Sequence, residues 1–344
     1  MTAKAAAGQA PTSATPSRPD RFAYELERDL VERAIALRAV LRSEAPFGER
    51  QRSMTDVVFR ELCALNLFAM LAPRRWGGLG LPASAMMRIN REIAKGGQYL
   101  VTIEQPDGRV TPGHFAYIPM KDTEIIDTWF CAGLQGTSSD SVRTKDLFVP
   151  EHRMVQGEKS FGSDRDVQEH TGEPSDYWPN IPLIRATGLV LLLGAAEGAL
   201  ELALEAAGKR GIPNTTYKRQ ADAPVAQRNL GEAASRIDAG RLLIEEGTTL
   251  LDRLALRHEQ PDPRTRARLK AQVSTIVKLL TSAVDTIMFS AGSSAFMLDN
   301  PLQRFWRDIN VGARHAIYNP DVGYEVFGRD LLHVEPNIAP PILI

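Results

Sequence analysis

Apolar side chains recur at three- and four-residue steps along most of the chain after residue 22. This spacing places them on one face of an α-helix and predicts a helical segment over residues 22–95. Within it, one helix runs through Leu41, a second reaches Phe68, and a third covers residues 83–95. The Gly-rich turn at 76–82 does not have the glycine spacing of a phosphate-binding loop.

Longer helices of the same kind are predicted in the second half of the chain. They occupy residues 186–209, 226–254, 269–287 and 301–316. The connector HEQPDPRT contains two prolines, so the two helices on either side of it should pack antiparallel. Gly240 and Gly247 lie on the apolar face of the predicted helix at 226–254 and allow a neighbouring helix to approach closely. The sequence therefore predicts a C-terminal helical bundle over residues 183–344, ending in a tail.

The pattern between these helical regions changes to short strand-like runs separated by turns. The runs begin at residues 98, 114, 123 and 141. They predict a small antiparallel β-domain which, with a polar connector, covers residues 97–182. The fold class is thus mainly α with a small β-domain, following an N-terminal helical domain at 21–96. Residues 1–20 contain almost no large apolar side chain and are predicted to be a disordered tail.

The charge balance, the cysteine count and the length of the apolar runs narrow the classes of function that the protein can have. The 41 Lys and Arg residues nearly balance the 42 Asp and Glu residues, for a formal net charge of -1. Bulk charge therefore gives no support for a nucleic-acid or anionic-membrane partner. Two cysteines, Cys63 and Cys131, fit a reducing cytoplasm. The longest apolar run, residues 188–196, is too short to span a bilayer.

Candidate chemistry is confined to a few places. The six histidines contain no HxxxH pair and the cysteines no CxxC pair, so no metal site is expected. The turn QGTSSD at 135–140 offers amides and hydroxyls that suit a polar ligand, but lacks the context of a serine nucleophile. Lys209 and Arg210 end an apolar helix, where a cation also simply complements the helix dipole. His315, on a polar helical segment, is by itself more typical of a structural residue.

Longer motifs resemble a known superfamily. WFCAGLQGTSSDSVRTKDLFVPEHRMV (129–155) is similar to the central β-domain signature of the acyl-CoA dehydrogenases, and LNLFAMLAPRRWGGLGLP (65–82) to their helical entry segment. The segments that start at Lys209 and Asp299 resemble the two-component (class D) flavin-dependent monooxygenase branch. The resemblance implies hydroxylation of an aromatic or polycyclic compound through a flavin hydroperoxide. It also implies reduced FMN supplied by a flavin reductase, with FAD as the alternative, and a cytoplasmic homotetramer.

The same resemblance implies site residues. His315 matches the histidine that lies against the flavin and is the expected catalytic residue, with Ala316 beside it in the cofactor site. Arg210 matches the arginine that binds the flavin phosphate, usually across a subunit boundary. Ser293 matches a hydroxyl position beside the flavin tail.

Two alternatives stay open at this point. An FAD-dependent acyl-CoA dehydrogenase needs a carboxylate base. Ala316 and Thr187 occupy the two places where that base is expected, which disfavours dehydrogenation. A catalytically inactive scaffold is favoured by the direct join at Gly96–Gly97, where family members carry further helices and strands, including part of the flavin site.

Overall fold

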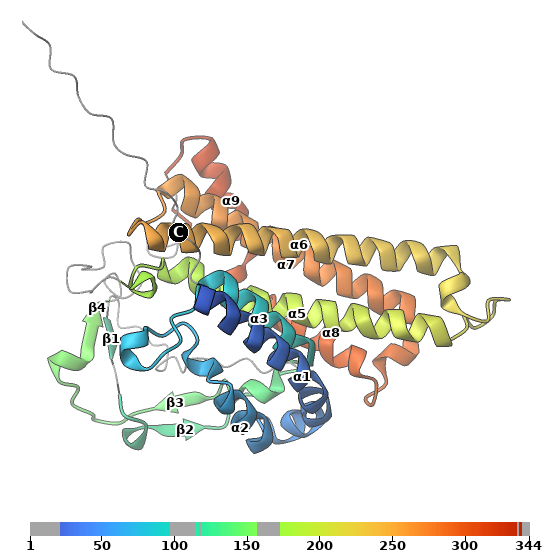
Figure 1. Ribbon diagram of the computed structural model, residues 1–344, viewed down its shortest axis with the longest axis horizontal. Coiled ribbons are helices and arrows are strands. Elements are labelled where there is room, and N and C mark those ends of the chain that lie inside the picture. Colours follow the sequence, from blue (N-terminus) through green and yellow to red (C-terminus); the bar gives the residue numbers. More distant parts are fainter. Residues whose placement is uncertain (1–20, 97–113, 117, 157–172, 336, 339–344) are drawn as a thin grey trace, which may run out of the picture.

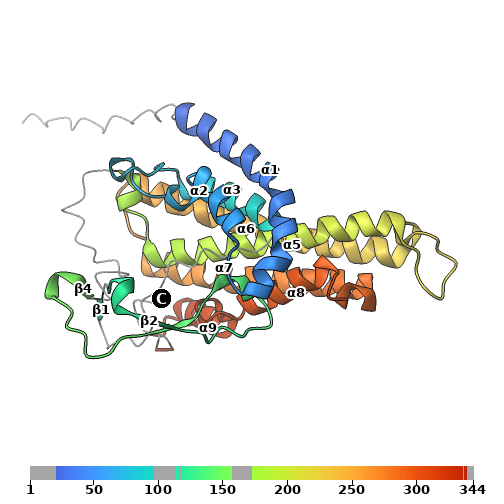
Figure 2. The same ribbon diagram turned by 90° about the horizontal axis from the view of Figure 1, so that it is seen from below.

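The computed structural model describes residues 21–96, 114–116, 118–156, 173–335 and 337–338. Over these residues an elongated helical bundle carries a layer of N-terminal helices on one side and two short β-ribbons beside one end (Figures 1 and 2). The mainly α fold class with a small β part is confirmed. The join at Gly96–Gly97 and the run that begins at residue 98 fall at or beyond the edge of the described residues.

The bundle is built around one apolar helix. Its helices are α5 (Asn180–Lys209), α6 (Pro224–Leu256), α7 (Pro263–Ala291), α8 (Pro301–Gly312) and α9 (Pro320–Leu331). Buried side chains from α5, α6, α7 and α8, including Leu193, Leu280 and Ile309, form the main core. The connector after α6 breaks the helix as predicted, and Asp262 accepts a hydrogen bond from the Thr265 amide at the start of α7.

Helix α9 was not among the helices predicted for the C-terminal bundle. Val326 is buried on this helix, which packs against α7. Gly323 permits the contact, because a Cβ there would lie only 1.9 Å from the hydroxyl oxygen of Ser274. The helix is short and its pattern is interrupted by two glycines, which hides its periodicity in the sequence.

The N-terminal layer has its own core. It consists of α1 (Arg21–Gln51), α2 (Asp56–Ala64) and α3 (Ala83–Gly96). Leu41, Leu81 and Met86 are fully buried within it, and α3 packs between α1 and α5. The three predicted helices are present, and the first extends further than its periodic run indicated.

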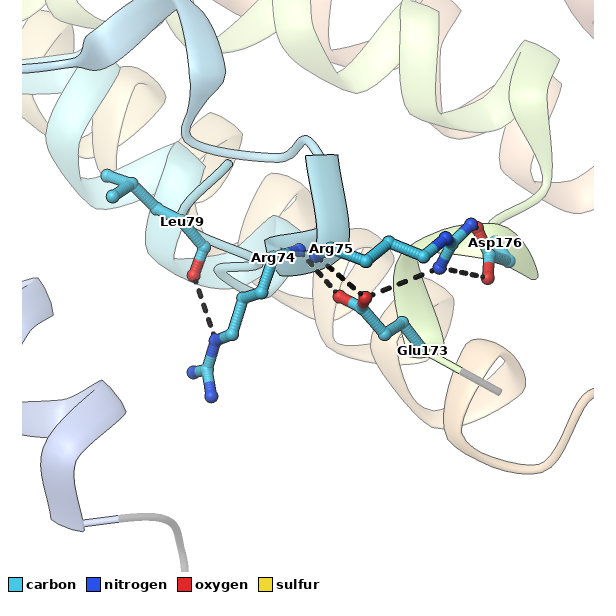
Figure 3. A network of polar contacts seen from close by, with 5 residues as sticks. All are labelled: Arg74, Arg75, Leu79, Glu173 and Asp176. Carbon is cyan, nitrogen blue, oxygen red and sulfur yellow. Dashed lines mark hydrogen bonds and ion pairs between the residues drawn. The ribbon is translucent and has the colours of Figure 1, made fainter. Parts of the chain in front are cut away.

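The turn after residue 73 is anchored by carboxylates rather than arranged around a ligand (Figure 3). Glu173 accepts hydrogen bonds from the main-chain amides of Arg74 (2.7 Å) and Arg75 (3.2 Å). The Arg75 guanidinium donates two hydrogen bonds, of 2.8 and 2.6 Å, to buried Asp176. These contacts tie the N-terminal layer to the segment that leads into α5.

Within the described residues, the strands of the β region are shorter than the pattern predicted. Strand β1 (His114–Ala116) pairs with β4 (Met154–Gln156), and β2 (Glu124–Ile126) with β3 (Ser141–Arg143), both antiparallel. The run after β2 leaves the extended conformation, since Leu134 and Ser138 are left-handed and enclose a short 3₁₀ helix. Contacts with α8 and α1, described below, hold it there.

Helices α5 and α7 are each long and apolar enough to cross a membrane by length and composition alone. In their most apolar windows, 61% of the α5 residues and 50% of the α7 residues are buried inside the protein. Their apolar composition is accounted for by their central place in the bundle, and the expectation of no membrane partner stays a prediction.

Candidate functional site

His315 follows α8 and caps a short 3₁₀ helix, Ala316–Tyr318. Its Nδ1 atom accepts a hydrogen bond of 3.2 Å from the Ile317 amide. Because an amide can only donate, Nδ1 must carry a lone pair, and the ring proton lies on Nε2. His315 is exposed to solvent in the single chain. Protein atoms around part of its imidazole ring still desolvate it, and this lowers the pKa of His315. The geometry therefore presents a neutral imidazole whose Nε2–H is a hydrogen-bond donor.

Tyr318 anchors the turn that carries His315. Its ring is buried, and its hydroxyl lies 3.5 Å from the carbonyl oxygen of Arg185 on α5. Gly188 makes room for it, because a Cβ at that position would lie 1.8 Å from the Tyr318 hydroxyl oxygen. Burial raises the pKa of the Tyr318 phenol. This contact between a helix glycine and an aromatic ring was not predicted from the sequence.

Two buried cations lie near this anchor. Burial lowers the pKa of Arg185 to about 10. Burial and the charge of Arg185 lower the pKa of Lys270 to about 8. Arg185 borders a cavity of about 40 Å³ between α5, α6 and α7, whose other lining is mostly apolar and includes Leu189 and Ile276. Neither cation was predicted from the sequence, since both stand inside otherwise regular apolar helix patterns.

Arg210 reaches the segment that holds Ser293. It stands in extended conformation just past α5, and its Nη2 atom donates a 2.5 Å hydrogen bond to the Ser294 hydroxyl. Lys209, in the last turn of the helix, pairs instead with Glu205 at 2.6 Å. The Arg210 guanidinium thus meets the Ser294 hydroxyl next to exposed Ser293, a donor set that suits a phosphate group.

The predicted site residues fall into two groups within one chain. Ser293 precedes α8, and His315 and Ala316 follow it. The helix has 12 residues, and at 1.5 Å per residue it spans about 18 Å. The structure therefore brings Arg210 close to Ser293, but holds both far from His315.

The turn after Trp129 rests directly on α8. The Leu134 amide donates a 2.5 Å hydrogen bond to a carboxylate oxygen of buried Asp308. Arg307 donates to the carbonyl oxygen of Ala132. A Cβ on Gly133 would lie 2.5 Å from the Arg307 carbonyl oxygen, so only glycine fits this approach. The residues just before the 135–140 turn thus dock the β region on the bundle.

Glu49 joins α1 to the same place. Its two carboxylate oxygens accept hydrogen bonds from Arg304 (2.8 Å) and Arg307 (2.5 Å). A cavity of about 20 Å³ borders Glu49 and Asp308, enough for about one water molecule. Burial, reinforced by the charge of Glu49, raises the pKa of Asp308 to about 7. Nothing in the sequence indicated the partners of Arg307 and Asp308.

No group of three or more potential metal-ligating side chains occurs within the part of the chain that the structure describes. The chemistry visible in these residues is therefore that of one neutral imidazole donor, one exposed guanidinium with hydroxyls, and a buried carboxyl group.

Comparisons with known proteins agree with the fold. Residues 188–320 match the family model described as acyl-CoA dehydrogenase, C-terminal domain. The chain is 33% identical to a flavin-dependent monooxygenase, oxygenase subunit HsaA, from Mycobacterium tuberculosis, over 67% of this chain and 58% of that protein. It is 30% identical, with the same coverage, to the oxygenase component of an FADH(2)-dependent resorcinol hydroxylase from Rhizobium sp..

A solved structure extends the likeness to most of the chain. XiaF from Streptomyces sp., in complex with FADH2 and glycerol, superposes with a TM-score of 0.82 at 25% identity, covering 93% of this chain and 98% of that one. The sequence matches to the two curated relatives span 58% of their length. These matches confirm the resemblance seen in the motifs: the chain has the fold of the acyl-CoA dehydrogenase superfamily, and its relatives are oxygenase components of flavin-dependent monooxygenases.

Proposed function

We propose that the chain is the oxygenase component of a two-component monooxygenase that hydroxylates a small aromatic or polycyclic compound. Reduced flavin comes from a separate flavin reductase. The names of the relatives support this activity. The observation that carries it is His315, a neutral imidazole fixed by the Ile317 amide, with Ala316 beside it where a dehydrogenase would need a carboxylate.

His315 acts as a hydrogen-bond donor in this proposal. Because Nδ1 is occupied by the Ile317 amide, the ring offers the Nε2–H bond to an oxygen atom of a bound ligand. A neutral ring with Nδ1 occupied does not serve as a strong proton acceptor, so donation is favoured over base catalysis. When bound, the reduced flavin supplies the electrons that activate dioxygen.

Arg210, Ser293 and Ser294 hold the flavin phosphate in this proposal, with FMN as the expected cofactor and FAD as the alternative. Their donor set fits a phosphate. Since α8 separates them from His315 by about 18 Å, we infer that each site takes its phosphate contacts from a second copy of the chain. A homotetramer in the cytoplasm is the assembly that fits this arrangement.

The reaction itself tests the function. The protein is mixed with chemically reduced FMN, dioxygen and a panel of phenols, and the hydroxylated product and hydrogen peroxide are both measured. Chemical reduction of the flavin removes the dependence on a reductase. Wild type should use part of the dioxygen that it consumes to form hydroxylated product and release the rest as hydrogen peroxide.

The variants identify the role of His315. His315→Ala should shift the products toward peroxide, and His315→Asn, which keeps a donor, should shift them less. His152→Ala, at an exposed histidine of the β region, is the control. An unaltered ratio of product to peroxide in His315→Ala contradicts the proposed role. A wild type that neither binds reduced flavin nor forms product supports the inactive scaffold instead.

A further inference from the structure

A short connection between α8 and α9 carries His315. It begins after Gly312, where α8 ends, and ends before Pro320, where α9 begins. Within residues 314–319, Tyr318 is the only buried residue, and the others are exposed or half-buried. A segment of this kind is held in place mainly by the side chain that it buries. The position of the segment around His315 therefore depends on Tyr318.

The helices on either side of this connection are seated on the bundle by contacts of their own. Gly312 lies so close to α5 that a Cβ there would be 2.7 Å from Cδ2 of Leu192. On α9, Val326 is only 1% exposed, and this helix packs against α7. Loss of the Tyr318 ring should therefore loosen the connection while both helices stay in place.

The Tyr318 ring, rather than its hydroxyl group, forms the anchor. A Cβ on Gly188 of α5 would lie 1.8 Å from the hydroxyl oxygen and 3.0 Å from Cζ, so the tyrosine fills the space of a missing side chain. The hydroxyl lies 3.5 Å from the Arg185 carbonyl oxygen, which is long for a hydrogen bond. Burial of the large ring is the stronger contribution.

His315 is bonded directly to the residues that this ring holds. The Tyr318 amide donates a hydrogen bond of 2.9 Å to the His315 carbonyl oxygen. The Ile317 amide donates one of 3.2 Å to Nδ1 of the imidazole. The His315 and Tyr318 rings also lie near each other, with centroids 5.9 Å apart and planes tilted by 56°. Both the main chain and the ring of His315 thus follow the position of Tyr318.

We propose that Tyr318 is a positioning residue for His315: its ring, packed against Gly188 on α5, fixes the turn at residues 316–318. The fixed turn keeps the Ile317 amide on Nδ1, so that the Nε2–H bond of His315 keeps one orientation. The hydroxyl group of Tyr318 is dispensable for this role. The positioning can be tested in the free protein, and only its consequence for catalysis rests on the proposed function.

NMR spectroscopy of the free protein provides the test. The ¹⁵N shifts of the imidazole report its protonation, and hydrogen exchange reports the Ile317 amide. In Tyr318→Leu this amide should exchange about 2- to 10-fold faster than in wild type, which corresponds to the net contribution of one hydrogen bond. The pKa of His315, lowered in the fold by desolvation, should rise toward the ordinary histidine value of about 6.5. Both changes follow because the ring loses its neighbour and its amide donor.

Four other variants complete the experiment. Tyr318→Phe should keep the wild-type signals. Gly188→Ala displaces an intact Tyr318 and should act like Tyr318→Leu, so it provides the same test if that variant does not fold. Gly208→Ala, on the same helix, should match wild type. Val326→Ala controls for a general loss of stability. Wild-type signals in Tyr318→Leu, or equally large changes in Val326→Ala or Tyr318→Phe, overturn the positioning role.

The consequence for catalysis has its own readout. Tyr318→Leu should shift the products toward peroxide as His315→Ala does. Its affinity for reduced FMN should stay unchanged, because Arg210 bonds to Ser294, before the start of α8. A wild-type product ratio in a Tyr318→Leu protein whose NMR signals have changed overturns the link to catalysis. If wild type forms no product while the NMR signals change as expected, the proposed function fails and the positioning of His315 is supported.

Discussion

Gly188→Ala should destabilise the protein by forcing Tyr318 out of its place. A Cβ at position 188 would lie 1.8 Å from the Tyr318 hydroxyl oxygen and 3.0 Å from Cζ, so the ring or α5 must move. The ring is buried and α5 is the central helix of the bundle, so neither can move freely. Overpacking of this kind costs about 1–3 kcal/mol, against up to about 1 kcal/mol gained by replacing glycine in a helix.

A control on the same helix separates these two effects. Gly208 has no atom within 4 Å of its ideal Cβ, so Gly208→Ala should show only the helix preference and be neutral or stabilising. The difference in unfolding free energy between the two variants, measured by urea denaturation, should be about 1–3 kcal/mol. Equal unfolding free energies would show that the helices move apart at no cost.

Tyr318→Phe provides the rescue. It removes the atom that lies at 1.8 Å and leaves Cζ at 3.0 Å. The lost hydrogen bond is long, at 3.5 Å, so the single variant should change little. The double variant should therefore be more stable than Gly188→Ala alone, a non-additive result. Strict additivity would refute the steric argument.

Two further predictions concern the carboxylates that anchor the N-terminal layer. Hydrogen bonds from the Arg74 and Arg75 amides hold the pKa of Glu173 below its usual value. Its ionised form therefore stabilises the fold above the ordinary carboxyl pKa, and this contribution is lost as the pH falls. Glu173→Gln should accordingly have a lower urea midpoint than wild type at neutral pH. Its midpoint should also fall less than that of wild type as the pH is lowered. Midpoints of the two proteins that run parallel at all pH values would contradict this. Asp252 accepts the Ala83 amide at 2.7 Å at the start of α3. Asp252→Ala should cost about 1 kcal/mol, as a lost helix cap does, and an unchanged thermal midpoint would contradict that role.

The helices could be predicted because the residue pattern that indicates each helix lies within one continuous segment. Apolar residues at steps of three and four, such as those from Ala226 to Leu254, indicate a helix with one buried face, and no distant contact is needed to recognise it. The break after α6 was equally visible in its prolines. Helix α9 was missed because it is short and gains its place from one glycine, Gly323, that only a neighbouring helix explains.

The β region and the site depend on contacts between distant residues. The run after β2 reads as a strand, yet Leu134 is held in a left-handed turn by Asp308, 174 positions away. Arg210 and Ser293 were each predicted to contact the flavin, and Arg210 bonds to Ser294, the neighbour of Ser293; their role toward a flavin stays a prediction. No pattern in the sequence could show that the Ile317 amide fixes the tautomer of His315.

Anaerobic titration of the protein with reduced FMN tests the central claim most directly. Wild type should bind reduced FMN, or reduced FAD if that is the cofactor. Arg210→Ala should weaken binding by about 10- to 100-fold, the range expected for loss of a hydrogen bond to a charged group. Lys209→Ala removes a neighbouring charge that pairs with Glu205, and should change the affinity by less than about twofold. A wild type that binds neither reduced flavin, or two variants that lose affinity equally, would contradict the account.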